Sequence, residues 1–208
     1  MDQPPNRPTP CTALTLPAEL PVMVLSDCYL FPGCFMPLFI FEQRYRDMLE
    51  TVLSGNRMFC IGSRVSKHSD EVLPITTAGL VHACVKHDDG TSHLILMGLR
   101  RVRLLNWVDQ QPYRVAAVEP LPTKAAPTDV LERLRTDALG SIPSCPHEAA
   151  PAIEALCSDL KRSSDPELVC DILSYHFINH AATLRSLLTE TCAIKRYEVL
   201  IDSLRNCR

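Results

Sequence analysis

The sequence has few glycines, and their spacing excludes a phosphate-binding loop. Its 208 residues include only seven glycines. No two have the spacing G-x-x-x-x-G-K-[ST], which lets backbone amides and a lysine hold nucleotide phosphates. A nucleophile elbow, G-x-S-x-G, is absent as well. We therefore expect no ATPase motor, no enzymatic activity and no cofactor.

Long apolar runs and strong net charge are also missing. No apolar stretch approaches the ~20 residues of a membrane-spanning helix. The polar, proline-rich start of the chain lacks the basic residues and apolar core of a signal peptide. The net charge of −3 and the 6% aromatic content argue against nucleic acid as the main partner. We expect a cytoplasmic protein without a membrane partner.

Metal-binding patterns are incomplete. None of the ten cysteines forms a C-x-x-C pair, so reduced, buried thiols are the expected state. His176 and His180 are four residues apart on a predicted helix, but Phe177 stands where a zinc metalloprotease needs its glutamate. Cys145 and His147 lack a second ligand pair. We predict no metal site.

The stretch from Leu30 to Leu53 organises the chain. Residues 35–41 read F-M-P-L-F-I-F, which predicts a strand buried on both faces. Pro32-Gly33 predicts a tight turn before it. From Glu42 the apolar period becomes helical, which predicts a helix that ends near Gly55. Its buried face is expected at Tyr45, Met48, Leu49 and Val52.

The remaining patterns place strands first and helices afterwards. Residues 1–20 are rich in proline and are expected to form a flexible leader. Short strands are expected at 21–25, 58–61, 79–87, 92–97, 99–107 and 113–118. Val81, Ala83 and Val85 are expected to face one way, Asp88-Asp89-Gly90 to form a hairpin, and Gly98 to mark a bulge or bend. This pattern predicts a partly closed antiparallel β structure.

Helical signals fill the second half of the chain. Three prolines mark a boundary between a β-rich part, residues 21–122, and a helical part, residues 123–208. Thr128 is expected to cap the first helix, and Asp165 to cap a later helix with Pro166 at its first position. The predicted class is therefore α+β, a partly closed β-barrel followed by a small helical bundle.

Several segments resemble one family. F-P-G followed by P-L-F-I-F-E-Q-R-Y-R-D-M resembles the signature of the LON substrate-binding domain, the amino-terminal domain of ATP-dependent Lon proteases. M-G-L-R-R-V-R-L-L and the closing K-R-Y-E-V-L are similar to later parts of that family. The similarity covers residues 20–205 and is weakest between Lys124 and Arg162. It implies a PUA-like β-barrel joined to a helical bundle in one LON domain.

The resemblance also implies a function. A LON domain helps to select substrates for proteolysis and does no chemistry itself. Unfolded or apolar polypeptide segments are then the expected partners, together with a protease. Binding is expected in a groove between the β lobe and the helices, through apolar side chains and free strand edges. RNA binding by the PUA-like barrel and small-ligand binding, with a reactive cysteine, are the alternatives.

Six residues are candidates for this groove, and each has a structural alternative. They are Phe39, Phe41, Arg44, Tyr45, Arg101 and Arg103. Phe35, Met36, Phe39 and Phe41 are alternatively core residues. Glu42, Arg44 and Tyr45 alternatively fix the helix on the sheet by an ion pair and hydrogen bonds. Arg100, Arg101 and Arg103 are alternatively solvated side chains on an exposed strand.

Overall fold

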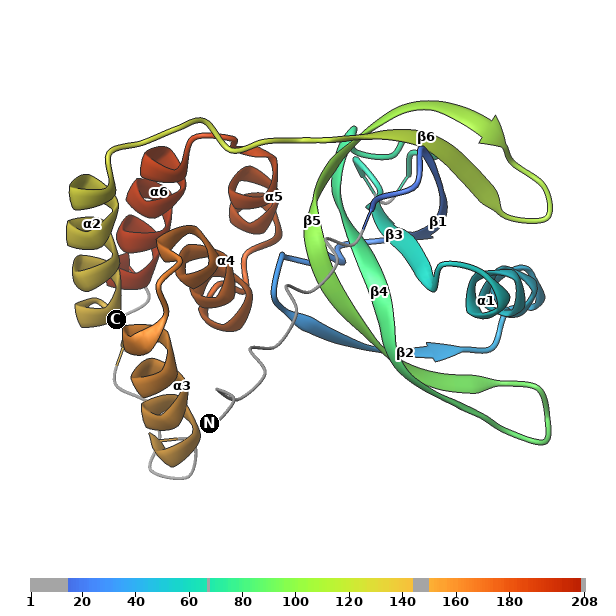
Figure 1. The fold of residues 1–208 in the computed structure, drawn as a ribbon, viewed down its shortest axis with the longest axis horizontal. Coiled ribbons are helices and arrows are strands. Elements are labelled where there is room, and N and C mark those ends of the chain that lie inside the picture. Colours follow the sequence, from blue (N-terminus) through green and yellow to red (C-terminus); the bar gives the residue numbers. More distant parts are fainter. Residues whose placement is uncertain (1–14, 67, 144–149, 207–208) are drawn as a thin grey trace, which may run out of the picture.

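The computed structural model describes residues 15–66, 68–143 and 150–206 and places them in a β lobe and a helical lobe (Figure 1). The strands are β1 (Glu19–Leu25), β2 (Phe35–Ile40), β3 (Met58–Ser63), β4 (Ile75–Lys86), β5 (Ser92–Asp109) and β6 (Arg114–Pro120). The helices are α1 (Gln43–Ser54), α2 (Thr128–Gly140), α3 (Ala150–Arg162), α4 (Pro166–Phe177), α5 (Ala181–Thr189) and α6 (Ala193–Asn206). Most of the predicted leader, Cys11, Cys145, His147 and Cys207 lie outside the described residues.

The sheet closes on itself through its longest strand. Its order is β2-β5-β4-β3-β1-β6, and β5 also pairs with β6, which makes a ring of five strands with β2 beside it. The first half of β5 pairs with β2 and the second half with β6. Residues 92–109 form one continuous strand, although two strands were predicted there. The predicted α+β class with a partly closed barrel is confirmed.

One pairing differs from the predicted antiparallel structure. β1 and β3 are parallel, with Val22 opposite Cys60 and Val24 opposite Gly62. Parallel neighbours need a long crossover connection. Here β2 and α1 supply that crossover, because both lie between β1 and β3 in the chain. The purely antiparallel prediction is therefore wrong at this point.

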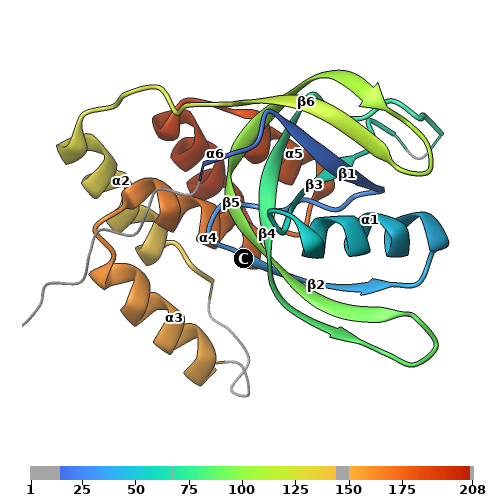
Figure 2. The same cartoon turned by 45° about the vertical axis from the view of Figure 1, so that its right-hand side comes forward.

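Helix α1 lies against the β lobe on the side away from helices α2 to α6 (Figure 2), and its buried face is the predicted one. Its buried residues are Tyr45, Met48, Leu49 and Val52, and it ends at Gly55. They pack in a core with Met36 and Ile40 of β2 and with residues of β1, β3, β4 and β5. This core fixes which face of β2 points inward.

The prediction that residues 35–41 are buried on both faces is wrong. Met36 and Ile40 are buried, whereas Phe35, Phe39 and Phe41 are 49%, 48% and 60% exposed. The reason is that α1 covers only one face, so the alternation of a strand leaves every second side chain outside. Phe35, Phe39 and Phe41 are not core residues.

A bulge changes the predicted faces of β4. Val81 is opposite Leu96, but the next pair is Ala83 with Ile95, so His82 is an extra residue in the strand. A bulge shifts the alternation by one residue. Val81 is therefore buried, whereas Ala83 and Val85 are exposed, contrary to the prediction. The predicted hairpin is present, and Gly90 has φ +80°.

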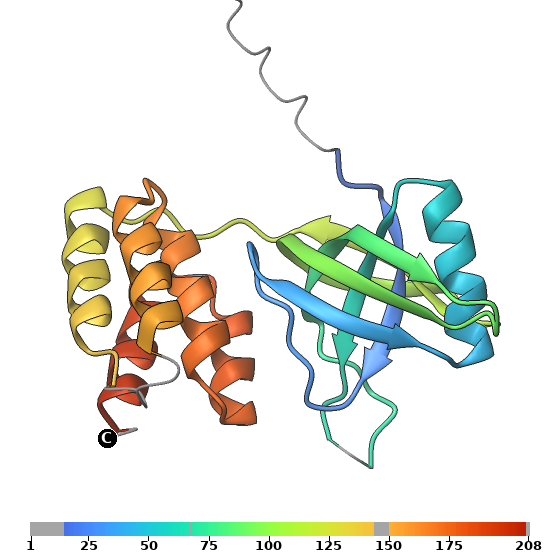
Figure 3. The same ribbon diagram turned by 90° about the horizontal axis from the view of Figure 1, so that it is seen from below.

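The helical lobe packs beside the β lobe and is joined to it by residues 121–127 (Figure 3). Its core contains Leu131, Val169, Leu173, Leu188 and Leu200, together with Phe31 of the β lobe. Asp165 caps α4 with hydrogen bonds to two backbone amides, and Pro166 follows it, as predicted. Thr128 does not cap α2, because the N-cap position is Pro127.

The loop before β2 is held against β5 by two glycines. The Gly33 amide donates to the Gly98 carbonyl at 2.8 Å, and the Gly98 amide donates to the Cys34 carbonyl at 2.9 Å. Gly33 has φ +75°, as the predicted turn requires. A Cβ atom at Gly98 would lie 2.1 Å from the Phe31 carbonyl oxygen. Only glycine allows this approach of two backbone segments.

We predict that Gly98→Ala lowers the free energy of unfolding by about 2 kcal/mol or more, because backbone rather than a flexible side chain must move. Urea unfolding followed by circular dichroism measures this. Gly140→Ala is the control, because no described atom beyond its chain neighbours and its own helix backbone lies within 4 Å of the added Cβ. A Gly98 variant as stable as the Gly140 variant contradicts this explanation.

Candidate functional site

The outer face of the three strands β2, β5 and β4 is apolar and uncovered. Seven residues with exposed or half-exposed side chains form this outer face: Phe35, Pro37, Phe39, Ala83, Val85, His93 and Ile95. Sheets with one solvated face normally carry polar side chains there. A contiguous apolar patch on a sheet is the kind of surface that marks a binding site.

Strand register brings these residues into two rows. Phe39, His93 and Val85 lie opposite one another across the three strands. The neighbouring row is Pro37, Ile95 and Ala83. Side chains directly opposite one another are close enough to form a continuous surface. A shallow hollow of about 420 Å³ lies over both rows.

Phe39 is the centre of an aromatic group on this face. Its ring stacks on His93 with centroids 4.6 Å apart, and the Phe41 ring lies 5.8 Å from it. His93 in turn makes a 2.8 Å hydrogen bond with His87. The rings are thus held in place before any partner binds, which reduces the entropy lost on binding.

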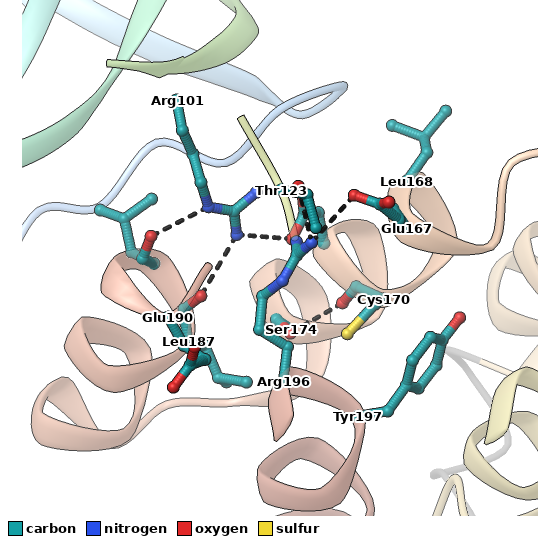
Figure 4. A network of polar contacts seen from close by, with 12 residues as sticks. Arg101, Thr123, Glu167, Leu168, Cys170, Ser174, Leu187, Glu190, Arg196 and Tyr197 are labelled. Atoms are coloured by element: carbon teal, nitrogen blue, oxygen red, sulfur yellow. Dashed lines mark hydrogen bonds and ion pairs between the residues drawn. The ribbon is translucent and has the colours of Figure 1, made fainter. Parts of the chain in front are cut away.

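Of the predicted binding residues, Arg101 has a structural role instead (Figure 4). Its side chain is 6% exposed. The two terminal nitrogens donate to the two oxygens of Asp171 at 2.6 and 2.7 Å. Its remaining donors reach the carbonyls of Leu187 and Leu188 at the end of α5. The interpretation of Arg101 as a solvated surface residue is wrong, because the helical lobe covers this part of β5.

Asp171 is shared with a second buried arginine. Arg196 of α6 donates to an Asp171 oxygen at 2.7 Å and to Glu167 at 3.1 Å. Burial is the largest single effect on the pKa of Arg196 and lowers it, but Asp171, Cys170 and Glu167 together raise the pKa above its usual value. Two carboxylates from α4, with Asp171 shared, therefore balance the guanidinium charges from β5 and α6.

The other candidates do not join the aromatic group, although the Arg44 guanidinium lies 4.5 Å from the centre of the Tyr45 ring. Arg103 is exposed and pairs with Glu119 of β6 at 3.1 Å. Arg44 is exposed and pairs with Glu42 at 2.7 Å. Tyr45 is buried, and its hydroxyl bonds both the amide and the carbonyl of Val24 at 3.1 Å. Tyr45 therefore fixes α1 on β1, in agreement with the structural alternative.

A groove does lie between the two lobes, with a volume of about 480 Å³. Its walls include Gly98 and Arg100 of β5, and Asp165 and Leu168 at the start of α4. Among the six candidates, only Arg101 borders it. The structure thus does not bring the six together, and only Phe39 and Phe41 belong to the aromatic group.

Five residues of the outer face were not predicted from the sequence: Pro37, Ala83, Val85, His93 and Ile95. The alternation of apolar residues in β4 predicts the wrong faces for Ala83 and Val85, because the bulge at His82 reverses the alternation. In β5, both alternating sets contain apolar residues, which also fits a strand covered on two faces. Only the position of α1 shows that this part of β5 is covered on one face and not on both.

Three of the described cysteines are buried in the core. Burial raises the pKa of Cys60 to about 12, and Cys34 and Cys170 also reach about 12, mainly through burial. His176 and His180 were predicted to lie on one helix. This prediction is wrong, because α4 ends at Phe177 and His180 is the N-cap residue of α5. Within the described residues, no group of three metal-binding side chains is present, and no helix is long and apolar enough to cross a membrane.

Comparison with known proteins identifies similar chains. Residues 19–206 match the model of the ATP-dependent protease La (LON) substrate-binding domain. The chain is 35% identical over 108 residues to the Lon protease of Desulfosudis oleivorans, which is 49% of this chain and 13% of that protein. It is 21% identical over 200 residues to the Lon protease of Trichlorobacter lovleyi, which is 92% of this chain and 24% of that protein. The chain thus spans a quarter or less of these relatives.

Two solved structures share the fold. The N-terminal domain of the Mycobacterium avium complex Lon protease has a TM-score of 0.71 at 18% identity, covering 89% of this chain and 97% of that one. The Lon N-terminal domain protein from Xanthomonas campestris has a TM-score of 0.63 at 21% identity, covering 88% and 97%. The arrangement of barrel and helices is therefore that of Lon N-terminal domains.

We predict that Asp171→Asn lowers the free energy of unfolding by about 3–5 kcal/mol, because two buried guanidinium groups lose their shared counter-charge. Urea unfolding measures the change. Glu119→Gln is the matched control, since its exposed pair with Arg103 is expected to contribute less than about 1 kcal/mol. Equal losses in both variants would show that the buried pair has no special role.

Proposed function

Because the chain belongs to the LON substrate-binding domain family, we propose that it binds unfolded or apolar polypeptide segments on the outer face of β2, β5 and β4. The module does no chemistry itself. The observation that carries this proposal is the apolar outer face, with Phe39 48% exposed and Val85 61% exposed. A folded protein offers few apolar side chains to such a surface, whereas an unfolded chain offers many.

The composition of the face favours polypeptide over RNA. None of its seven residues carries a fixed positive charge, although nucleic-acid binding depends on contacts to phosphates. Aromatic stacking alone, without basic residues beside it, gives little affinity for RNA. An apolar peptide needs only the apolar side chains and the hollow above them.

The relatives suggest a fate for the bound polypeptide. The curated relatives are Lon proteases, and this chain matches a part of each. We infer that bound polypeptides are passed to a protease in the cytoplasm. The shallow, open hollow suits this role, because a client held only by surface contacts can be released.

We predict that replacing Phe39 and Val85 together by serine weakens binding of reduced, carboxymethylated α-lactalbumin, a permanently unfolded protein, by about tenfold or more. Each half-exposed side chain contributes about 1 kcal/mol when a partner covers it. Fluorescence anisotropy of the labelled client at micromolar concentrations measures the dissociation constants.

The control replaces Leu105 and Val108 by serine, because these side chains are 53% and 48% exposed but lie on the other half of β5. Its binding is expected to equal that of the unmodified protein. The proposal fails if the unmodified protein shows no saturable binding, or if both double variants weaken it equally.

A further inference from the structure

β2 is an edge strand with one side unpaired. It ends the strand order of the sheet and pairs with β5 alone. No other strand of the described residues lies along its second edge. Such an edge presents backbone donors and acceptors to any extended chain that reaches it.

The hydrogen bonds around Gly98 show which residues of β2 direct their backbone N–H and C=O groups to this free edge. The Gly98 amide donates to the Cys34 carbonyl, so the backbone carbonyl of Cys34 points toward β5. Backbone groups of an antiparallel pair alternate in direction. The backbone groups of Phe35, Pro37 and Phe39 therefore point away from β5, toward the free edge.

Two independent observations agree with this direction. The hydroxyl of Tyr175 on α4 donates to the Phe35 carbonyl at 3.1 Å, from outside the β2–β5 pair. Pro37 has no amide hydrogen, yet the register runs through it without a shift. A proline is tolerated in a strand when its nitrogen faces an open edge. The amide and carbonyl of Phe39 and the carbonyl of Pro37 are thus left without partners among the described residues.

We propose that a client polypeptide adds to this edge of β2 as an extra β-strand, an inference that rests on the proposed function and specifies how the client is held. Phe35, Pro37 and Phe39 have their backbone groups at the edge and their side chains on the outer face. An added strand therefore places every second side chain beside Phe35 and Phe39. The preferred client is an extended segment of about five residues with apolar side chains at alternate positions.

A second copy of this chain fits the edge less well than a client does. In a pairing of β2 with β2, each strand contributes a Pro37 that has no hydrogen to donate. The pairing would therefore leave acceptors unsatisfied on both sides. An unfolded client without proline supplies a donor at every residue.

The test uses the fluorescein-labelled peptide Lys-Val-Ser-Val-Ser-Val-Ser-Lys and two N-methylated forms. One form carries methyl groups on the three valine amides and the other on the three serine amides. A strand on the β2 edge uses only one of these sets, because amides alternate in direction. We expect one methylated form to bind at least about tenfold more weakly and the other to bind like the parent. Loss with the valine set indicates an antiparallel strand, and loss with the serine set a parallel strand.

Amide hydrogen exchange supplies a second measurement. Saturating parent peptide is expected to slow exchange of the Phe39 amide about tenfold or more, with little change at Leu38, whose amide points toward β5. If both methylated peptides bind like the parent and Phe39 exchange is unchanged, edge addition is overturned while apolar binding stands. If no peptide and no unfolded client binds, the proposed function itself fails. Concentration-dependent doubling of the mass in solution, reversed by the peptide, would assign the edge to a second copy and also overturn the inference.

Discussion

The arrangement of the two lobes depends on the buried ion pair between Arg101 and Asp171. A guanidinium group that leaves water must find hydrogen-bond acceptors and an opposite charge. Arg101 finds both only in the helical lobe, in the carboxylate of α4 and in two carbonyls at the end of α5. Its planar fork suits two carboxylate oxygens at once. Any shift of one lobe against the other would leave charge buried without a partner.

This attachment also explains why the outer face stays open. Helices α2 to α6 gather on one side of the β lobe and α1 lies on the opposite side (Figures 1 and 3). α1 packs with the buried residues of β2, β4 and β5, and so leaves their outer face uncovered. A second helix packed on the outer face of β2, β5 and β4 would give a sheet with helices on both faces, which is a common layer arrangement. Because the helical lobe packs elsewhere, Phe39 and Val85 stay 48% and 61% exposed among the described residues.

Local sequence patterns predicted the helices and turns well, but they predicted poorly which side chains are buried. The period of α1, the cap at Asp165 and the hairpin at Gly90 all depend on neighbouring residues, so sequence reveals them. Arg101 and Arg103 show the opposite case. They are two residues apart on one strand with no register shift between them, yet one is buried and the other exposed. The difference comes from Asp171, 70 residues later in the chain, which no local pattern can place. The outer face was missed for the same reason, with the bulge at His82 as an additional local cause.

The three most deeply buried thiols have a consequence for chemical durability. Peroxides attack the thiolate form of cysteine, and exposure controls the rate. Cys34, Cys60 and Cys170 remain protonated far above neutral pH and are shielded by the core. The raised pKa and the burial therefore slow the oxidation of these sulfurs while the fold is intact. The packing of the two cores that contain these three sulfurs is therefore protected against thiol oxidation at these positions.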